Sequence, residues 1–199
     1  MHRPLALALA ALLVSTPAGA QDRPQGWYLT GFAGAALFDD LRVVGVGTGF
    51  DAPIDTGLGF GGGVGYALTP EIRTELEIAV RSGDVDLTTE ARYAALTVML
   101  NVWYDIPVEL GGIQPFIGGG IGIAESELMS TSQAQGAQDT VLALQVGGGA
   151  SLPLSENLEI FLQYRFVHVE AVEIQQSSGS ASFQADSHNI EGGLRLWLN

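Results

Sequence analysis

The sequence predicts an all-β fold, an eight-stranded antiparallel up-and-down barrel that crosses a membrane. Three observations predict it. Apolar and polar residues alternate with a period of two, the connections between the alternating runs are short and long in turn, and the apolar faces carry no charge within the runs. A length of 199 residues suits one such domain. We expect a barrel over residues 21–199, preceded by an export segment at 1–20.

The export segment has the three parts of a secretory signal peptide. A positive start at 2–3 precedes an apolar run at 5–14, and a small-residue cleavage site follows at 18–20. The apolar run is too short for a helix that spans a bilayer of about 30 Å. We therefore expect cleavage after Ala20 and export from the cytoplasm.

The clearest alternation lies in the run at 72–81. Its apolar residues, such as Leu76 and Ile78, share one face, and the charged residues Glu75 and Glu77 share the other. A helix would mix these two sets. The same pattern recurs along the chain, and it predicts strands at 27–38, 57–68, 72–81, 94–105, 113–123, 142–152, 158–166 and 189–198.

The connections between these strands alternate in length. Short turns at one rim and long polar loops at the other are typical of a transmembrane barrel. An even number of strands puts both ends of the barrel at the short-turn rim, and closure pairs the first strand with the last. The predicted short turns are 69–71, 106–112 and 153–157, and the predicted long loops are 39–56, 82–92, 125–139 and 169–187.

Alternation alone also fits a soluble, lipocalin-like barrel with its apolar face around an internal ligand. Three features favour the lipid-facing orientation. The polar face is rich in glycine and alanine, which leave room for long charged side chains in a crowded lumen. A charge on the apolar face at mid-depth would cost roughly 2–4 kcal/mol, and these faces have none. Trp27, Tyr66 and Tyr104 lie on the apolar face near the short turns, where they would form an aromatic girdle.

The inward faces carry arginine and glutamate. Eight strands enclose an interior that side chains just fill, and an unpaired buried charge is costly. We therefore predict a salt-bridged, closed lumen; the alternative is a narrow channel whose ion pairs exchange partners. The predicted charge network consists of Arg73, Glu75, Glu77, Arg81, Glu159, Arg165, Glu191 and Arg195.

Composition excludes several classes of function. With no cysteine, the chain has no disulfide scaffold, thiolate catalysis or cysteine-ligated zinc. A formal net charge of −14 is unfavourable for nucleic-acid binding. We predict no catalytic residue, no cofactor and no specific metal site. The acidic long loops leave one alternative open, that divalent cations bridge their carboxylates to the phosphates of lipopolysaccharide.

Four short segments carry a family resemblance: GWYLTG at 26–31, LNVWYD at 100–105, QPFIGGG at 114–120 and QYRF at 163–166. Their order and spacing resemble small eight-stranded outer-membrane barrels of Gram-negative bacteria, of the opacity and surface-antigen types, and more distantly the transmembrane domain of outer-membrane protein A. The resemblance implies an outer-membrane location and a structural or surface-exposed envelope role without enzyme activity, in adhesion or envelope integrity. It also implies outer-membrane lipid and lipopolysaccharide as partners.

The last predicted strand is similar to the C-terminal assembly signal of such barrels. The pattern positions are Glu191, Gly193, Leu196 and Leu198. The resemblance implies recognition by the barrel-assembly machinery. The chain departs from the pattern because it ends in Leu198-Asn199 and not in an aromatic residue.

Two histidines raise a further alternative, a lipid A-modifying enzyme. Outer-membrane lipid A deacylases are also eight-stranded barrels and have a His-x-Ser-Asn pattern. The run that begins at His168 has neither the serine nor the asparagine. Ser187 precedes His188, but neighbours on a strand point to opposite faces. We expect both histidines at the rim, level with the lipid headgroups.

Overall fold

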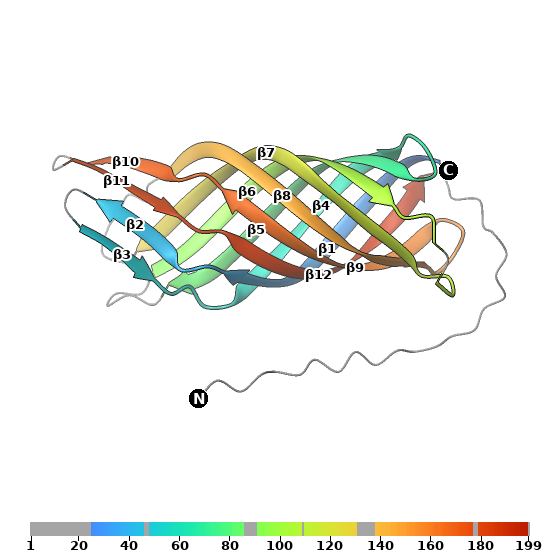
Figure 1. Ribbon diagram of the computed structural model, residues 1–199, viewed down its shortest axis with the longest axis horizontal. Helices are drawn as coiled ribbons and strands as arrows, with labels where there is room; N and C mark the ends of the chain where they lie inside the picture. The colour runs from blue at the N-terminus through green and yellow to red at the C-terminus, as the bar shows by residue number, and fades with distance from the viewer. Residues whose placement is uncertain are drawn as a thin grey trace, which may run out of the picture.

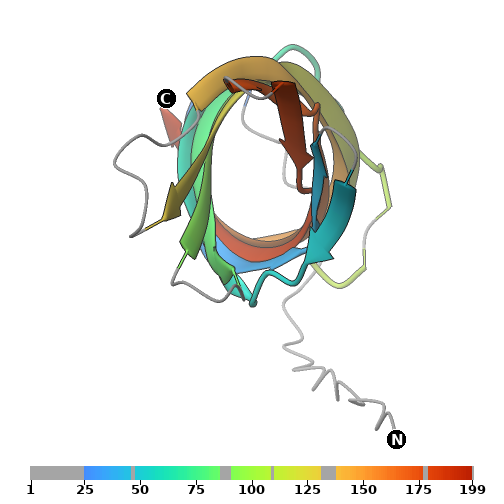
Figure 2. The same cartoon turned by 90° about the vertical axis from the view of Figure 1, so that its left-hand side faces the viewer.

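Eight long strands close into one barrel in the computed structural model (Figures 1 and 2). The structure describes residues 25–45, 48–85, 91–108, 110–130, 138–176 and 179–198, and the predicted signal peptide at 1–20 lies outside these ranges. Within them, no helix is long and apolar enough to cross a membrane. The barrel strands are β1 (Gly26–Phe38), β4 (Gly57–Ala67), β5 (Ile72–Val85), β6 (Ala91–Asp105), β7 (Gln114–Ser130), β8 (Gln138–Pro153), β9 (Leu158–Val169) and β12 (Ser187–Leu198).

The strand order around the barrel confirms the predicted topology. It runs β1-β12-β9-β8-β7-β6-β5-β4 with antiparallel pairing throughout. The first and last strands close the ring, with partners from Trp27↔Leu198 to Phe38↔Ser187. Closure gives the backbone of every barrel strand two hydrogen-bonding neighbours, which hydrocarbon requires because it contains no water.

The two faces of the strands lie in opposite environments. Outward residues such as Leu76, Leu100 and Leu162 are 53–57% exposed, whereas inward Arg73 and Arg165 are 1% exposed. A water-soluble protein has the opposite arrangement, with charged residues outside. The apolar outer band and the charged interior are those of a transmembrane barrel. The soluble, lipocalin-like alternative is therefore wrong.

Glycines on the inward face make room for bulky neighbours. A methyl group on Gly65 would lie 2.1 Å from the Tyr28 ring, and one on Gly118 would lie 2.5 Å from the Trp103 ring. A methyl group on Gly147 would lie 3.1 Å from the Arg165 side chain. The small residues thus admit aromatic rings as well as the arginines for which the sequence predicted space.

Several strands continue beyond the predicted limits, so the boundaries of the long loops at 82–92 and 125–139 were wrong. β5 ends at Val85 and β6 begins at Ala91, with Asp84 paired to Arg92. β7 continues to Ser130 and β8 begins at Gln138. The backbone hydrogen bonds between two strands continue into water once the strands are in register, because polar residues also form favourable cross-strand pairs. The remaining parts of these loops, 86–90 and 131–137, lie outside the described residues.

The other two predicted loops, 39–56 and 169–187, form a second sheet and are not irregular. It consists of β2 (Leu41–Gly45), β3 (Thr48–Ala52), β10 (Val172–Gln176) and β11 (Gly179–Gln184), in the order β10-β11-β2-β3. Figure 1 shows it projecting from the long-loop end of the barrel. The two hairpins pair through β11 and β2, from Ser182↔Val44 to Gln184↔Arg42. This contact joins segments more than a hundred residues apart, so local alternation does not indicate it.

A charge on the outer face tests the lipid contact. Leu76 points outward from the middle of β5, so Leu76→Arg should lower the free energy of unfolding by roughly 2–4 kcal/mol if it lies near the bilayer midplane. Urea unfolding in lipid vesicles measures this change. Val44→Arg is the matched control, because Val44 is 50% exposed on β2, outside the barrel, and should change stability little. Equal costs at the two positions would contradict the lipid-facing assignment.

Candidate functional site: the charged interior of the barrel

The lumen gathers charged side chains from strands on different sides of the barrel. Strand alternation turns four of them inward from β5, two from β9 and two from β12. All eight are at most 5% exposed. They are the residues named from the sequence: Arg73, Glu75, Glu77, Arg81, Glu159, Arg165, Glu191 and Arg195.

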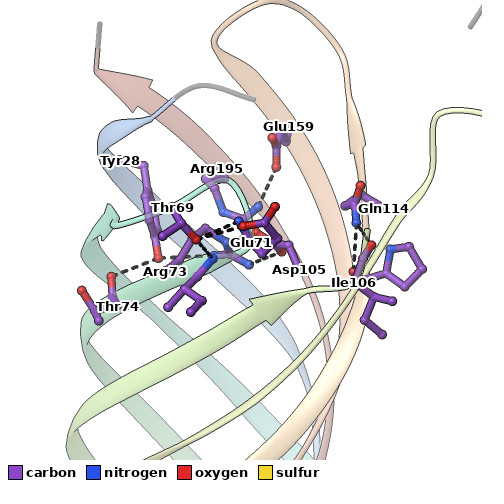
Figure 3. Close-up of polar contacts among 12 residues, drawn as sticks. Tyr28, Thr69, Glu71, Arg73, Thr74, Asp105, Ile106, Gln114, Glu159 and Arg195 are labelled. Carbon is purple, nitrogen blue, oxygen red and sulfur yellow. Dashed lines mark hydrogen bonds and ion pairs between the residues drawn. The ribbon is translucent and has the colours of Figure 1, made fainter. Parts of the chain in front are cut away.

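A first group of ion pairs lies near the short-turn end (Figure 3). Arg73 donates from Nε and Nη2 to the two carboxylate oxygens of Asp105 at 2.7 and 2.9 Å, a two-pronged contact. Arg195 donates to Glu159 at 2.6 Å. The Trp197 indole N–H donates to the other oxygen of Glu159 at 3.1 Å. Both carboxylates are thereby held by two donors.

Aromatic rings stack against the same arginines. The guanidinium carbon of Arg73 lies 5.5 Å from the Tyr28 ring centre, and that of Arg195 lies 5.5 Å from the rings of both Tyr28 and Phe161. Arg73 also donates to the Tyr28 hydroxyl at 3.3 Å. Cation–π contacts of this kind stabilise a desolvated guanidinium on the faces that make no hydrogen bond.

A second group lies farther along the lumen and centres on Arg165. Arg165 contacts Glu77 directly, and its Nε lies 3.2 Å from Glu191. Arg81 donates to the other oxygen of Glu191 at 3.1 Å. Neutral side chains complete the network. They are Asn101 on Glu77, Gln163 on Glu191, and Asn189 and Thr97 on Arg81.

Glu75 differs from the other predicted members of the network. It accepts a hydrogen bond from the Thr30 hydroxyl at 3.2 Å, and the described residues give it no ion pair. The structure thus brings seven of the eight residues into direct ion pairs. Asp105 supplies the partner of Arg73 that was missing from the sequence-based network. It is the last residue of the strand predicted at 94–105 and lies on its inward face, so the alternation already pointed it into the lumen, although it was not included in the predicted network.

Apolar side chains fill the lumen toward the long-loop end. One cluster joins Met99 and Val167 to neighbouring small residues, all at most 4% exposed. A second lies where the projecting sheet meets the barrel and packs Leu41 and Ile54 against Tyr93. The cluster around Met99 lies beside the charged section, since Met99 is in register with Glu77, and the cluster around Leu41, Ile54 and Tyr93 lies at the long-loop end.

The predicted interfacial aromatic residues all point outward near the short turns. Trp27, Tyr66 and Tyr104 are 56%, 39% and 44% exposed. Trp27 and Tyr66 lie in register on β1 and β4, with ring centres 5.2 Å apart in an edge-to-face contact. Tyr104 is on β6, opposite Ile72 and Ile117.

The four residues of the C-terminal pattern divide between the two faces. Glu191 and Gly193 face the lumen, where Gly193 lies against the Phe161 ring. Leu196 and Leu198 face outward, at 39% and 47% exposed. The pattern therefore combines one buried ion-pair residue with two outward-facing leucines.

Both histidines lie on the outer face, away from Ser187. His168 contacts Asp186 at 3.0 Å, and His188 contacts the Tyr164 hydroxyl at 2.7 Å. Ser187 is buried inside and accepts a hydrogen bond from Asn189. The sequence neighbours Ser187 and His188 thus point away from each other. Across the described ranges, no three His, Asp or Glu side chains gather in a way that could hold a metal ion.

Comparison with known proteins agrees with this geometry. A family model for the outer membrane protein beta-barrel domain matches residues 6–194. The chain belongs to this family of outer-membrane β-barrel proteins. It is an integral protein of the outer membrane.

Solved structures show the same fold at low sequence identity. The outer membrane protein OprG from Pseudomonas aeruginosa is 15% identical with a TM-score of 0.61, over 89% of this chain and 99% of that one. Neisserial surface protein A is 14% identical with a TM-score of 0.55, over 87% and 97% of the two chains. A search of curated protein sequences finds no match.

Removing the Asp105 side chain tests how much the buried ion pairs contribute to the stability of the barrel. Asp105→Ala leaves the Arg73 guanidinium buried without its carboxylate, so we expect the free energy of unfolding to fall by about 3–5 kcal/mol. Urea unfolding in lipid vesicles measures it. Asp51→Ala is the control, because it removes the partner of exposed Arg42 and should cost at most about 1 kcal/mol. A small effect at both positions would show that the lumen pairs are dispensable.

Proposed function

We propose that this protein is a structural, surface-exposed component of the outer membrane, without enzyme activity, whose lumen is closed to ions. The observation that carries the proposal is the filling of the lumen by paired charges. Buried arginines and carboxylates in ion pairs occupy the space through which an ion would have to pass, although Glu77 Oε1, Arg165 Nε and Arg195 Nε have no hydrogen-bond partner among the described residues. Apolar clusters at the long-loop end support closure from the outer side.

The residues at the short-turn interface support a permanent place in the envelope. We propose that Trp27, Tyr66 and Tyr104 anchor the short-turn end at the lipid headgroups, as aromatic belts do. We propose outer-membrane lipid and lipopolysaccharide as the surrounding partners. We further propose that Glu191, Gly193, Leu196 and Leu198 form the signal read by the barrel-assembly machinery.

The projecting sheet supports a role at the cell surface. In barrels of this type the long loops face the outside of the cell. Here two of the long loops form a sheet. Described carboxylates around it include Asp39, Asp40 and Asp51, which are all exposed. An acidic, ordered surface of this kind suits contact with extracellular molecules or with other components of the envelope.

A narrow channel is the second candidate, and one observation favours it. Arg165 lies within ion-pair distance of both Glu77 and Glu191. An arginine with two carboxylate neighbours is able to move its guanidinium group from one carboxylate to the other. Such an exchange of ion-pair partners would open a path for ions. The closed state agrees with more of the contacts inside the barrel, because the apolar clusters also have to move before an ion can pass.

Planar-bilayer recording tests closure. We expect the wild-type protein to give no conductance steps. Arg165→Ser should give brief cation-selective openings, because it leaves Glu77 and Glu191 short of positive charge and draws in water. Arg92→Ser, which changes an exposed arginine on β6 paired with Asp84, should stay silent. Steady conductance of the wild-type protein would favour the channel instead.

Lipid A analysis tests the absence of enzyme activity. Serine or another nucleophile needs a base within hydrogen-bond reach, and among the described residues the hydrogen-bond and ion-pair partners of the two histidines are Asp186, Tyr164 and Asp39. We expect the mass of lipid A to be unchanged when the protein is expressed in a Gram-negative host. A mass shift that disappears in His168→Ala or His188→Ala would establish an enzyme.

A further inference from the structure

The outer face of the barrel carries a cluster of polar and aromatic side chains that the lumen network does not involve. It consists of Tyr164 and Phe166 on β9, His188 on β12, and Asp39 directly after β1. We name these four residues the rim cluster. Closure of the barrel brings them together, because β12 pairs with both β9 and β1.

The rim cluster lies at the boundary between the apolar band and the long-loop end. His188 stands ten residues from Leu198 along β12, and both point outward. At about 3.3 Å per residue and a tilt of about 40°, the two are about 25 Å apart along the membrane normal, the height of the apolar band of such barrels. The cluster is thus level with the headgroups of the outer leaflet.

The imidazole of His188 has one nitrogen engaged and one available. Its Nδ1 lies 2.7 Å from the Tyr164 hydroxyl. In the tautomer with hydrogen on Nε2, the hydroxyl donates to Nδ1 and the Nε2–H faces Asp39. Nε2 and the Asp39 carboxylate are 3.8 Å apart, which is too long for a hydrogen bond. A donor and an acceptor therefore stand side by side, partly exposed and not joined to each other.

Aromatic faces and an apolar surface surround this pair. The rings of Tyr164 and His188 are stacked with centres 6.1 Å apart, and Phe166 lies 5.1 Å from the imidazole. Tyr164 remains 46% exposed. Toward the middle of the membrane lie Leu162 and Ile190, at 56% and 49% exposed. A bound lipid would have polar contacts at its head and apolar contacts along its chains.

The charges around the cluster favour a neutral headgroup. A hydroxyl group both donates and accepts, so it fits between the Nε2–H of His188 and the carboxylate of Asp39. An anionic phosphate would meet the carboxylate of Asp39. Asp186, whose backbone oxygen accepts from the Asp39 N–H, adds a second carboxylate nearby, which His168 contacts at 3.0 Å. Arg42 and Arg92, the two described arginines outside the lumen, are paired with Asp51 and Asp84.

We infer that the rim cluster is a binding site for the sugar headgroup of a membrane glycolipid. Sugar hydroxyls bridge His188 and Asp39, the sugar ring packs against Tyr164 and Phe166, and the acyl chains lie on Leu162 and Ile190. The site rests on the placement of the barrel in the outer membrane but not on whether the lumen conducts. A conducting barrel would leave it intact, and loss of lipid binding would leave the closed lumen intact.

Native mass spectrometry of the protein in mixed-lipid nanodiscs tests the site. The probe is a diglucosyl diacylglycerol in a phosphatidylcholine bilayer, with phosphatidylglycerol as the anionic comparison. We expect the wild-type protein to retain the glycolipid in preference to phosphatidylglycerol. Tyr164→Phe removes the hydroxyl that fixes the tautomer of His188, and Asp39→Ala removes the acceptor, so each should weaken retention about fivefold, the value of one hydrogen bond.

Tyr104→Phe is the matched control, because Tyr104 is an outward tyrosine of similar exposure at the opposite interface. It should retain the glycolipid as the wild type does, and heat-modifiable gel migration checks that each variant is folded. Equal retention by Tyr164→Phe and the wild type would overturn the inference. So would equal retention of phosphatidylglycerol, since it indicates a site that takes an anionic headgroup as readily as a neutral sugar.

Discussion

Hydrocarbon contains no water to satisfy the polar groups of a polypeptide backbone, and a sheet in a membrane therefore has to be closed on itself. Here β1 meets β12 over twelve residue pairs, and no edge of the eight barrel strands is left within the lipid-facing band. Closure with only eight strands makes an interior that side chains just fill. Every inward charge is then removed from water and needs an opposite charge beside it.

The interior meets that demand with arginine as its only described cation, except at Glu75, which accepts a hydrogen bond from Thr30. Arginine has a planar fork that holds a carboxylate with two bonds, and flat faces that stack on aromatic rings. Arg73 uses both properties, with Asp105 in its plane and Tyr28 over its face. The glycines opposite the rings supply the space that this packing requires. Stability and closure of the lumen are thus two consequences of one arrangement.

The same alternation separates the chemistry of the two faces. Ser187 turns into the lumen and joins Asn189, while His188 turns outward and joins Tyr164. Two residues that a sequence motif would combine into one site consequently lie on opposite sides of the barrel wall. The polar groups that face the bilayer come instead from three neighbouring strands, at the level where lipid headgroups begin.

The sequence by itself determined the number of barrel strands, their order and the face of each residue, because a period of two is a local property of an extended chain. It also named eight charged residues of the lumen, without Asp105. Tertiary structure alone decided which charges pair, since Arg81 and Glu191 are 110 residues apart and meet only after closure. It likewise decided that the segments at 39–56 and 169–187 form a sheet, and that Asp39 stands beside His188. Those contacts depend on which inward side chains meet across the lumen and on how the loop hairpins pair with each other, and local alternation carries no record of either.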